Sequence, residues 1–343
     1  MKVKSAEQLM ADNLIVRHLA GSIAYGTSLP TSDIDYRGIF GADPVNIRTP
    51  FFTVREATVA NEEDTKYLEL THFMKLCLDC NPNIIETLWV DEGDIEFTTP
   101  AYEYLRSQRD KLLSSKVAFT FSGYAIAQLK RIKGHNKWIN NPHDVAPPKM
   151  TDFVKLVQNF TAKKLFDIDI NVFHDGYRLI PYGGNIFGLV NAPGYQTFNT
   201  KVPHHPLNTV WDGAASEEDD GLARKKPLFV VKFNKEEYVQ TKENHSQYWT
   251  WRNNRNAKRG ELEEQFGYDT KHAMHLVRLL RMGVEILSTG KVLVKRPDAA
   301  ELLEIRDGSM TYDEIVAYAT TIDAQARDVL YKTTQLRKKP DLK

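Results

Sequence analysis

Short apolar runs and alternating polar and apolar residues mark the first part of the chain, and both patterns predict β-strands. Leu14–Leu19 (LIVRHL) is the first predicted strand. In residues 33–39 (DIDYRGI) polar and apolar side chains alternate, which predicts a second strand with its charged side chains on one surface. Pro227–Phe233 (PLFVVKF) is predicted to be a further strand, and closely spaced glycines and prolines in residues 167–212 favour a small β element.

Longer segments repeat their apolar residues at helical spacing, namely His72–Asp79, Val117–Gly134 and Tyr268–Leu287. Strands early in the chain and helices later predict an α+β fold. We expect a sheet-containing N-terminal domain, a mostly helical C-terminal domain and a small β-containing insertion between them. The predicted bounds are 1–115 for the sheet domain, 116–139 with 246–343 for the helical domain, and 140–245 for the insertion.

The charge balance gives no overall reason to expect a polyanionic partner. The 343 residues include 45 basic and 45 acidic side chains, so binding to nucleic acid would need a local basic patch. The N-terminal MKVKSAEQLMADNL does not resemble a signal peptide, and no run approaches the ~18 apolar residues of a membrane span. With only two cysteines, the chain is expected to be a cytoplasmic protein without a membrane partner.

Residues Gly21–Phe40 (GSIAYGTSLPTSDIDYRGIF) carry the candidate chemistry. A Gly-Ser pair follows the first predicted strand, and a helix start there offers backbone N–H groups to phosphate. Asp33 and Asp35 are expected to project side by side, where two carboxylates repel each other unless a cation lies between them. Mg²⁺ binds one or two carboxylates together with phosphate oxygens, so the combination predicts a nucleotide site. Arg37 on the same face either forms an internal ion pair with Asp35 or contacts a phosphate.

The wording GSIAYGT…SDIDYRGIF resembles the signature of the DNA polymerase beta-type nucleotidyltransferase superfamily, in which Gly-Ser is followed by Asp-x-Asp after a short spacer. The full motif, from GSIAYGT to SDIDYRGIF, resembles the RlaP-type branch of this superfamily. The members of this branch are predicted nucleotidyltransferases associated with RNA repair genes. The resemblance implies a nucleotidyltransferase-fold catalytic domain with a mixed sheet, an NTP such as ATP as donor, and Mg²⁺ or Mn²⁺ as cofactor. It also implies that Ser22 contacts the triphosphate. The resemblance extends over residues 1–135 and 245–325.

The superfamily uses a third carboxylate on a neighbouring strand, and the candidates here lie in residues 61–71 (NEEDTKYLELT). The stretch DTKYLELTHFMKL resembles the corresponding segment of the branch, which favours Asp64. The predicted catalytic and metal-binding residues are therefore Asp33, Asp35 and Asp64, with Asp64 helping to deprotonate the attacking hydroxyl. Glu69 is the reserve candidate. Its alternative role is in the first turn of the following helix, where the dipole favours a carboxylate.

On a helical projection of Tyr268–Leu287, the residues Lys271, His275 and Arg278 form one stripe opposite an apolar face. Such a stripe is either a solvated basic surface or a positive wall for a triphosphate. The wording YDTKHAMHLVRLL resembles the second signature of the branch, in which lysine, histidine and arginine face the nucleotide. This stripe and Gly21–Phe40 are expected to face each other across one cleft. The predicted nucleotide-binding residues are Gly21, Ser22, Arg37, Lys271, His275 and Arg278.

Aromatic and basic residues are interleaved in Tyr248–Arg259 (YWTWRNNRNAKR), a composition that suits base stacking and phosphate neutralisation. The alternative is a helix with an aromatic core stripe and a solvated basic face. The W-x-x-RN-x-R wording also resembles the branch. The possible nucleic-acid contacts are Trp251, Arg252, Arg255 and Arg259.

Together these patterns favour a metal-dependent transfer of NMP from an NTP to a hydroxyl, with release of pyrophosphate. The association of the branch with RNA repair implies an RNA or tRNA-like 3′ end as the acceptor. Two alternatives stay open: transfer of NMP to a protein side chain or small molecule, and a non-catalytic nucleotide-sensing or RNA-binding module. The intact Asp-x-Asp argues against the last, because a pure binder does not need two adjacent carboxylates near phosphates.

Overall fold

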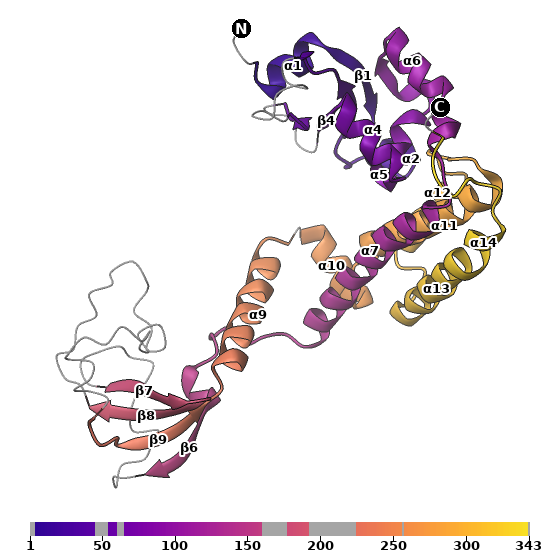
Figure 1. The fold of residues 1–343 in the computed structure, drawn as a ribbon. Coiled ribbons are helices and arrows are strands. Elements are labelled where there is room, and N and C mark those ends of the chain that lie inside the picture. Colours follow the sequence, from indigo (N-terminus) through magenta and orange to yellow (C-terminus); the bar gives the residue numbers. More distant parts are fainter. Residues whose placement is uncertain are drawn as a thin grey trace. The chain divides into compact units, whose positions relative to one another are not determined.

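The computed structural model of the protein describes residues 4–44, 54–59, 65–159, 177–191, 224–255 and 257–341. The chain divides into two compact units, which are drawn in Figure 1. The first unit combines Met1–Asn141 with Asn256–Lys343, and the second is Pro142–Arg255. The finer division of the first unit into a sheet domain and a helical domain stays a prediction.

A five-stranded mixed sheet forms the N-terminal part of the first unit, with the strand order β3-β4-β2-β1-β5. The central strand pair, β1 with β2, is antiparallel, whereas β2 and β4 run parallel. Both edge strands pair antiparallel with their neighbours. In chain order the strands are β1 (Leu14–Leu19), β2 (Tyr36–Phe40), β3 (Glu56–Ala57), β4 (Lys66–Glu69) and β5 (Ile95–Phe97).

Consecutive residues of β2 pack into two different cores, as the two-residue period of a strand requires. Ile39 packs with Val16 and Phe73, whereas Phe40 packs with Leu9 and Tyr67. Both faces of the sheet near β2 are therefore covered. The helices around the sheet are α1 (Ala6–Asp12), α2 (Gly21–Tyr25), α4 (Leu70–Leu78), α5 (Pro82–Ile85) and α6 (Pro100–Ser107), with 3-10 turns at Glu86–Leu88, Glu92–Asp94 and Arg109–Leu112.

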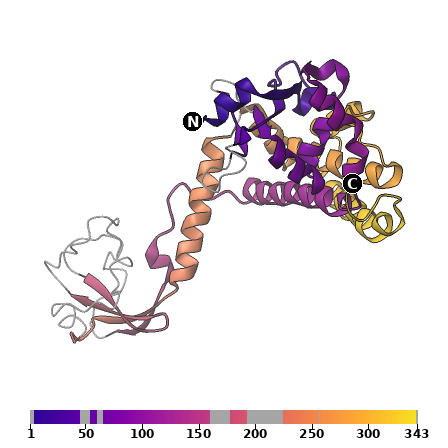
Figure 2. The same cartoon turned by 45° about the horizontal axis from the view of Figure 1, so that its top comes forward.

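The C-terminal part of the first unit is mostly helical and is built around α7 (Val117–Asn140) and α11 (Thr270–Thr289). These two helices pack along each other (Figure 1), and Figure 2 shows α7 as one uninterrupted helix from a second side. Gly283 allows this close packing, because a Cβ there would lie 3.1 Å from the Cβ of Phe121. The remaining elements are α10 (Ala257–Phe266), α12 (Ala299–Arg306), α13 (Tyr312–Ala324), a π-helical segment (Gln325–Leu330) and α14 (Tyr331–Thr333).

The second unit contains a four-stranded antiparallel sheet in the order β6-β9-β8-β7. Its core combines residues from the strands, such as Val231 and Phe233, with Tyr238 of the helix that follows them. The elements are a 3-10 turn (Met150–Phe153), β6 (Val154–Asn159), β7 (Tyr177–Gly183), β8 (Ile186–Asn191), β9 (Phe229–Phe233) and α9 (Lys235–Asn253).

The predicted fold class is confirmed: a mixed sheet forms the N-terminal region and most of the C-terminal part is helical. Within the part of the chain that the structure describes, no helix combines the length and the apolar composition needed to cross a membrane.

Candidate functional site

The predicted phosphate-binding turn lies in direct contact with the second aspartate. The chain leaves β1 at Leu19 and enters α2 at Gly21, and the backbone N–H of Ala20 donates a hydrogen bond to the carbonyl of Asp35 over 2.8 Å. A Cβ placed on Gly21 would lie 1.9 Å from Oδ2 of Asp35. Gly21 also has φ +58°, a conformation that glycine adopts without strain. Two independent features of this position, its space and its backbone, therefore require glycine.

Replacing Gly21 by alanine should both strain the backbone and push the Asp35 carboxylate away. The strain of a positive φ costs about 1–3 kcal/mol, and the displaced carboxylate should lower nucleotidyl transfer by tenfold or more. Gly26→Ala is the matched control. Gly26 has φ +72°, but the nearest atom to its Cβ would be 3.8 Å away, on Ala299. Urea unfolding and a transfer assay on both variants isolate the contact, since only Gly21→Ala should lose activity beyond its loss of stability.

The two aspartates precede β2 instead of lying within it, which corrects the predicted strand at residues 33–39. The strand begins at Tyr36, because a turn comes just before the aspartates. In that turn the backbone N–H of Leu29 donates to Oγ of Ser32, and the N–H of Ser32 donates to the carbonyl of Leu29. Asp33 is exposed and Asp35 half-buried. The Asp35 carboxylate packs against Gly21, and Asp33 precedes it by two residues. Carboxylate oxygens are hard donors of the kind that Mg²⁺ prefers.

There were two candidates for the third carboxylate, Asp64 and Glu69, and the structure describes only Glu69. Asp64 lies outside the described residues. Glu69 is only 4% exposed and caps the N-terminus of α4. It accepts hydrogen bonds from the backbone N–H of His72 at 3.0 Å and from the hydroxyl of Thr71 at 3.1 Å. Glu69 therefore stabilises the start of α4, which was the alternative to a catalytic role given for it from the sequence.

Arg37 is the second residue of β2, and its side chain reaches the start of α5. Its guanidinium donates a hydrogen bond to the backbone carbonyl of Asn83. Its side chain also lines a cavity of about 300 Å³, together with residues of β4, α4 and α7. Polar groups on this lining include Lys66, His72, Asn81 and Tyr124. Contact of Arg37 with a phosphate stays a prediction.

His18 is a buried histidine held in its neutral form next to Arg37. It pairs with Arg37 across β1 and β2, and burial together with the Arg37 charge lowers the pKa of His18 to about 4. One ring nitrogen, Nδ1, lies 2.7 Å from the carbonyl of Leu19, and Nε2 lies 3.2 Å from Oγ1 of Thr87. A neutral ring protonated on Nδ1 satisfies both contacts, because Nδ1–H donates to the carbonyl and Nε2 accepts from the hydroxyl.

This histidine should make the protein less stable in acid. The pKa of an unfolded histidine is about 6.5, so below that pH the unfolded chain takes up a proton that the folded chain refuses. The free energy of unfolding should therefore fall as the pH falls from about 6.5 to about 4, by roughly 3 kcal/mol in total. Urea unfolding at pH 7.5 and pH 4.5 measures the fall. It should shrink in His18→Gln and persist in His72→Gln, which removes a half-exposed histidine of α4.

Arg278 is buried and paired, so it does not belong to a solvated basic surface, which was one of the two alternatives for the stripe on α11. Its contact with a triphosphate stays a prediction. Its side chain is 4% exposed. Nη1 lies 3.0 Å from Oε1 of Glu86, and the guanidinium lies 3.8 Å above the ring of Tyr25. The hydroxyl of Tyr25 donates to the other Glu86 oxygen over 2.6 Å. The helical projection placed Arg278 opposite the apolar face, but the carboxylate of Glu86 allows that second side of the helix to be buried as well.

The other two members of the stripe differ from each other. Lys271 is exposed at the start of α11. His275 is half-buried, and burial together with the charges of Arg278 and Lys271 lowers its pKa to about 3. His275 is therefore neutral at physiological pH and can act as a hydrogen-bond partner, but not as a cation.

Tyr25 connects the Gly21–Phe40 stretch to α11. It ends α2, four residues after Gly21, and its ring and hydroxyl contact Arg278 and Glu86 respectively. Sequence reasoning did not single out Tyr25. The only sequence signal was its place in the motif GSIAY. Its contact with Arg278 could not be read from the sequence, because that residue lies far along the chain.

The aromatic residues near the end of α9 pack within the second unit. Tyr248 is buried and its ring stacks on that of His143, with centroids 4.7 Å apart. The guanidinium of Arg255 lies 5.1 Å from the ring centroid of Trp251. Arg252 is exposed. Arg259 belongs to α10 in the first unit, and its side chain lies outside the described part. An RNA contact by the four predicted residues, Trp251, Arg252, Arg255 and Arg259, stays a prediction.

Comparison with protein-family models gives one match. Residues 1–146 match RlaP, described as the RNA repair pathway DNA polymerase beta family. No curated protein and no solved structure matches the chain. The match covers the five-stranded sheet and α7, so it contains the contact of Gly21 with Asp35. It confirms the resemblance read from the Gly-Ser and Asp-x-Asp wording.

Proposed function

We propose that this chain, whose residues 1–146 form a polymerase beta-family nucleotidyltransferase domain of the RlaP type, transfers NMP from an NTP to the 3′ hydroxyl of an RNA. In the proposed reaction the hydroxyl oxygen attacks the α-phosphorus. The bond from the α-phosphorus to the bridging oxygen breaks, and pyrophosphate leaves. The hydroxyl proton passes to a carboxylate of the protein.

The observation that carries this proposal is the contact of Gly21 with Asp35. A phosphate-binding turn and a metal-binding carboxylate must lie within one ion's reach of each other, because the ion bridges carboxylate and phosphate oxygens. A Cβ on Gly21 would lie 1.9 Å from Oδ2 of Asp35, so the backbone of the turn packs against this carboxylate, and this closeness supports the proposal. A solvated Asp-x-Asp segment would not require glycine in a neighbouring turn, whereas here any side chain at residue 21 would clash with Asp35.

Asp33 and Asp35 would hold Mg²⁺, with Mn²⁺ as a substitute. The bound ion would neutralise charge on the triphosphate as pyrophosphate leaves. Asp64 is the proposed base. It stands two residues before Lys66, just as Asp35 stands two residues before Arg37, and Lys66 pairs with Arg37 between β4 and β2. Asp64 would accept the proton of the attacking hydroxyl.

The nucleotide contacts follow from charge and exposure. Ser22 lies half-exposed in the first turn of α2 and would donate its hydroxyl to a phosphate oxygen. Lys271 is the exposed cation of α11 and would bind the triphosphate as a point charge. His275, being neutral, would contribute a hydrogen bond. Arg278 is buried with Nη1 on Glu86, so it would contact the nucleotide through another of its N–H groups.

Two features support RNA as the acceptor. The family description names an RNA repair pathway, and Trp251, Arg252 and Arg255 bring aromatic rings and positive charge to the end of α9. We also propose a cytoplasmic location, because Cys77 and Cys80 are free thiols, as expected in a reducing compartment.

The test is a panel of the four α-labelled NTPs with Mg²⁺, offered separately to total RNA, RNAs with defined 3′ ends, and protein extract. We expect label in RNA from one preferred NTP, release of pyrophosphate, and no label with the Asp33→Asn protein. Label in protein only would leave the donor chemistry standing and replace the acceptor. NTP binding by a folded protein with no transfer to any acceptor would mean a nucleotide sensor and overturn the proposal.

A further inference from the structure

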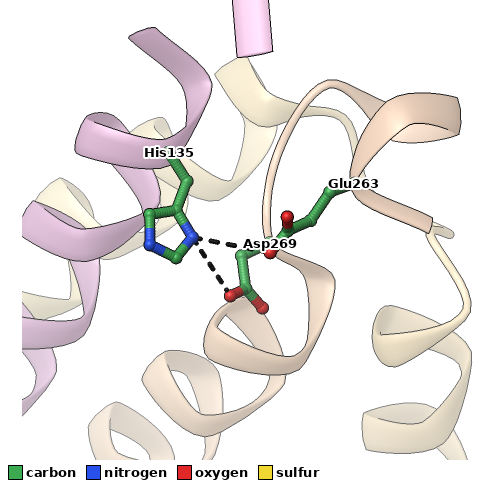
Figure 3. A group of neighbouring side chains, drawn as sticks. All are labelled: His135, Glu263 and Asp269. Carbon is green, nitrogen blue, oxygen red and sulfur yellow. Dashed lines mark ion pairs between the residues drawn. The ribbon is translucent and has the colours of Figure 1, made fainter. Parts of the chain in front are cut away.

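Three polar side chains that the proposed reaction does not use converge from three helical elements of the first unit (Figure 3). His135 belongs to α7, Glu263 to α10, and Asp269 caps the N-terminus of α11. The two carboxylate residues are 1% and 0% exposed, and the His135 side chain is 17% exposed. Each can offer one ligand atom, and these atoms all lie within 4.8 Å of one another.

The distances between these atoms resemble those between ligands of one metal ion. Nδ1 of His135 lies 3.3 Å from Oδ2 of Asp269 and 3.5 Å from Oε1 of Glu263. Charge-assisted hydrogen bonds between nitrogen and a carboxylate are shorter, about 2.7–2.9 Å. A tetrahedral ion with bonds of about 2.0–2.2 Å places its ligand atoms roughly 3.3–3.6 Å apart. Both measured distances fall in that range.

Hydrogen bonds from neighbouring groups hold the ligand residues in orientation, as such bonds do around metal sites. The backbone N–H of His272 donates to Oδ1 of Asp269 over 3.0 Å, which leaves Oδ2 directed at His135. The side-chain amide of Asn136 donates to the carbonyl of Gly267 over 2.9 Å. This bond ties the connection between α10 and α11 to the helix that carries His135. Trp138 and His272 flank the imidazole ring, with centroids 6.0 and 5.9 Å away.

We propose that Nδ1 of His135, Oε1 of Glu263 and Oδ2 of Asp269 bind one divalent transition-metal ion, with Zn²⁺ the best fit. An imidazole nitrogen favours zinc over magnesium or calcium, which take oxygen ligands. Two carboxylates and a neutral imidazole also balance the charge of a divalent ion, as a buried site requires. Three protein ligands leave a fourth position for water or another oxygen ligand. The site is separate in composition and in residues from the Asp33–Asp35 pair.

The competing explanation is an ion-pair cluster without metal. Burial by itself would lower the pKa of His135, but the neighbouring Asp269 and Glu263 carboxylates outweigh it and raise the pKa. A protonated His135 shared by two carboxylates would also bring the three side chains together. In that arrangement the cluster stabilises the junction of the three helices and has no affinity for metal.

Metal binding to the full-length chain separates the two explanations. The protein is stripped with a chelator and titrated with Zn²⁺ against a chromophoric competitor. The Asp33→Asn/Asp35→Asn background removes the other carboxylate pair. We expect one equivalent of tightly bound Zn²⁺ in this background, and Co²⁺ should give the intense visible absorption of a four-coordinate site. Glu263→Gln and Asp269→Asn should each weaken binding at least tenfold and abolish the Co²⁺ bands.

Glu261→Gln is the matched control, because it removes an exposed carboxylate from the same helix. Asn at position 269 keeps a side-chain oxygen for the helix cap, so it tests the ligand without removing the cap. Circular dichroism and the melting temperature of each metal-free variant report whether it folds. His135→Gln gives a second ligand variant if Glu263→Gln does not fold. A folded wild-type chain that binds no Zn²⁺, or binding equally weakened by Glu261→Gln, would overturn the proposal. None of these readouts depends on nucleotidyl transfer.

Discussion

Asp35→Asn should reduce nucleotidyl transfer by about three orders of magnitude or more while leaving the fold intact. The variant replaces a charged oxygen by a neutral amide at the carboxylate next to Gly21. Loss of an ion that stabilises the transition state costs several kcal/mol, and each 1.36 kcal/mol is a factor of ten in rate. Asparagine has nearly the shape of aspartate, so the contact with Gly21 and the hydrogen bond from Ala20 to the backbone of residue 35 persist. Single-turnover transfer with Mg²⁺ measures the loss.

Asp33→Asn should have a comparable effect, because both carboxylates are proposed to hold the ion. Asp110→Asn is the control for the loss of one negative charge, since Asp110 is exposed in the same unit. It should retain full activity. Higher Mn²⁺ should restore part of the activity of either catalytic variant if the defect is in metal affinity. Wild-type rates in Asp33→Asn or Asp35→Asn would refute the metal assignment at this site.

Breaking the buried pair of Glu86 and Arg278 should be the most destabilising change in the first unit among those considered. Both side chains are more than nine-tenths buried, at 6% and 4% exposed. Removing one member leaves the other charge buried without its partner, which typically costs 3–5 kcal/mol. We therefore expect Arg278→Gln and Glu86→Gln each to lower the free energy of unfolding by about that amount. The double variant should lose less than the sum, because neither charge remains. Urea unfolding of the four proteins completes this double-mutant cycle.

A surface pair provides the control for this cycle. Lys295 and Asp91 lie 3.6 Å apart with side chains 62% and 50% exposed, so Lys295→Gln should change the stability by less than about 1 kcal/mol. Tyr25→Phe should cost an intermediate amount, about 1.5–3 kcal/mol, because it removes one hydrogen bond to a charged group. The same variants also test the role of Arg278. A large loss of transfer in Arg278→Gln with little loss of stability would show that Arg278 serves the nucleotide instead of the fold.

Local patterns in the sequence were enough to predict the type of fold and the residues of the candidate reaction centre. β1 and the helical core of α11 lie where the apolar spacing predicted them. The Gly-Ser pair and the two aspartates were predicted to serve one site because they belong to one short stretch of chain, whereas the contact of Gly21 with Asp35 came from the structure. Close neighbours in sequence have few ways to be arranged, so their types and spacing carry most of the geometric information.

The start of β2, the environment of α11 and the cluster at His135 required the tertiary structure. Alternation predicted that the strand would include Asp33 and Asp35, but a hydrogen-bonded turn before them delays its start to Tyr36. A helical projection shows which residues share a side of α11, but it does not show what packs there. Glu86, 192 residues before Arg278, makes burial of that arginine possible. His135 and Asp269 are also far apart in the sequence, and they meet because α7 packs along α11. Contacts between distant residues depend on how whole helices and strands pack, and the local sequence of one element does not identify the residues that pack against it.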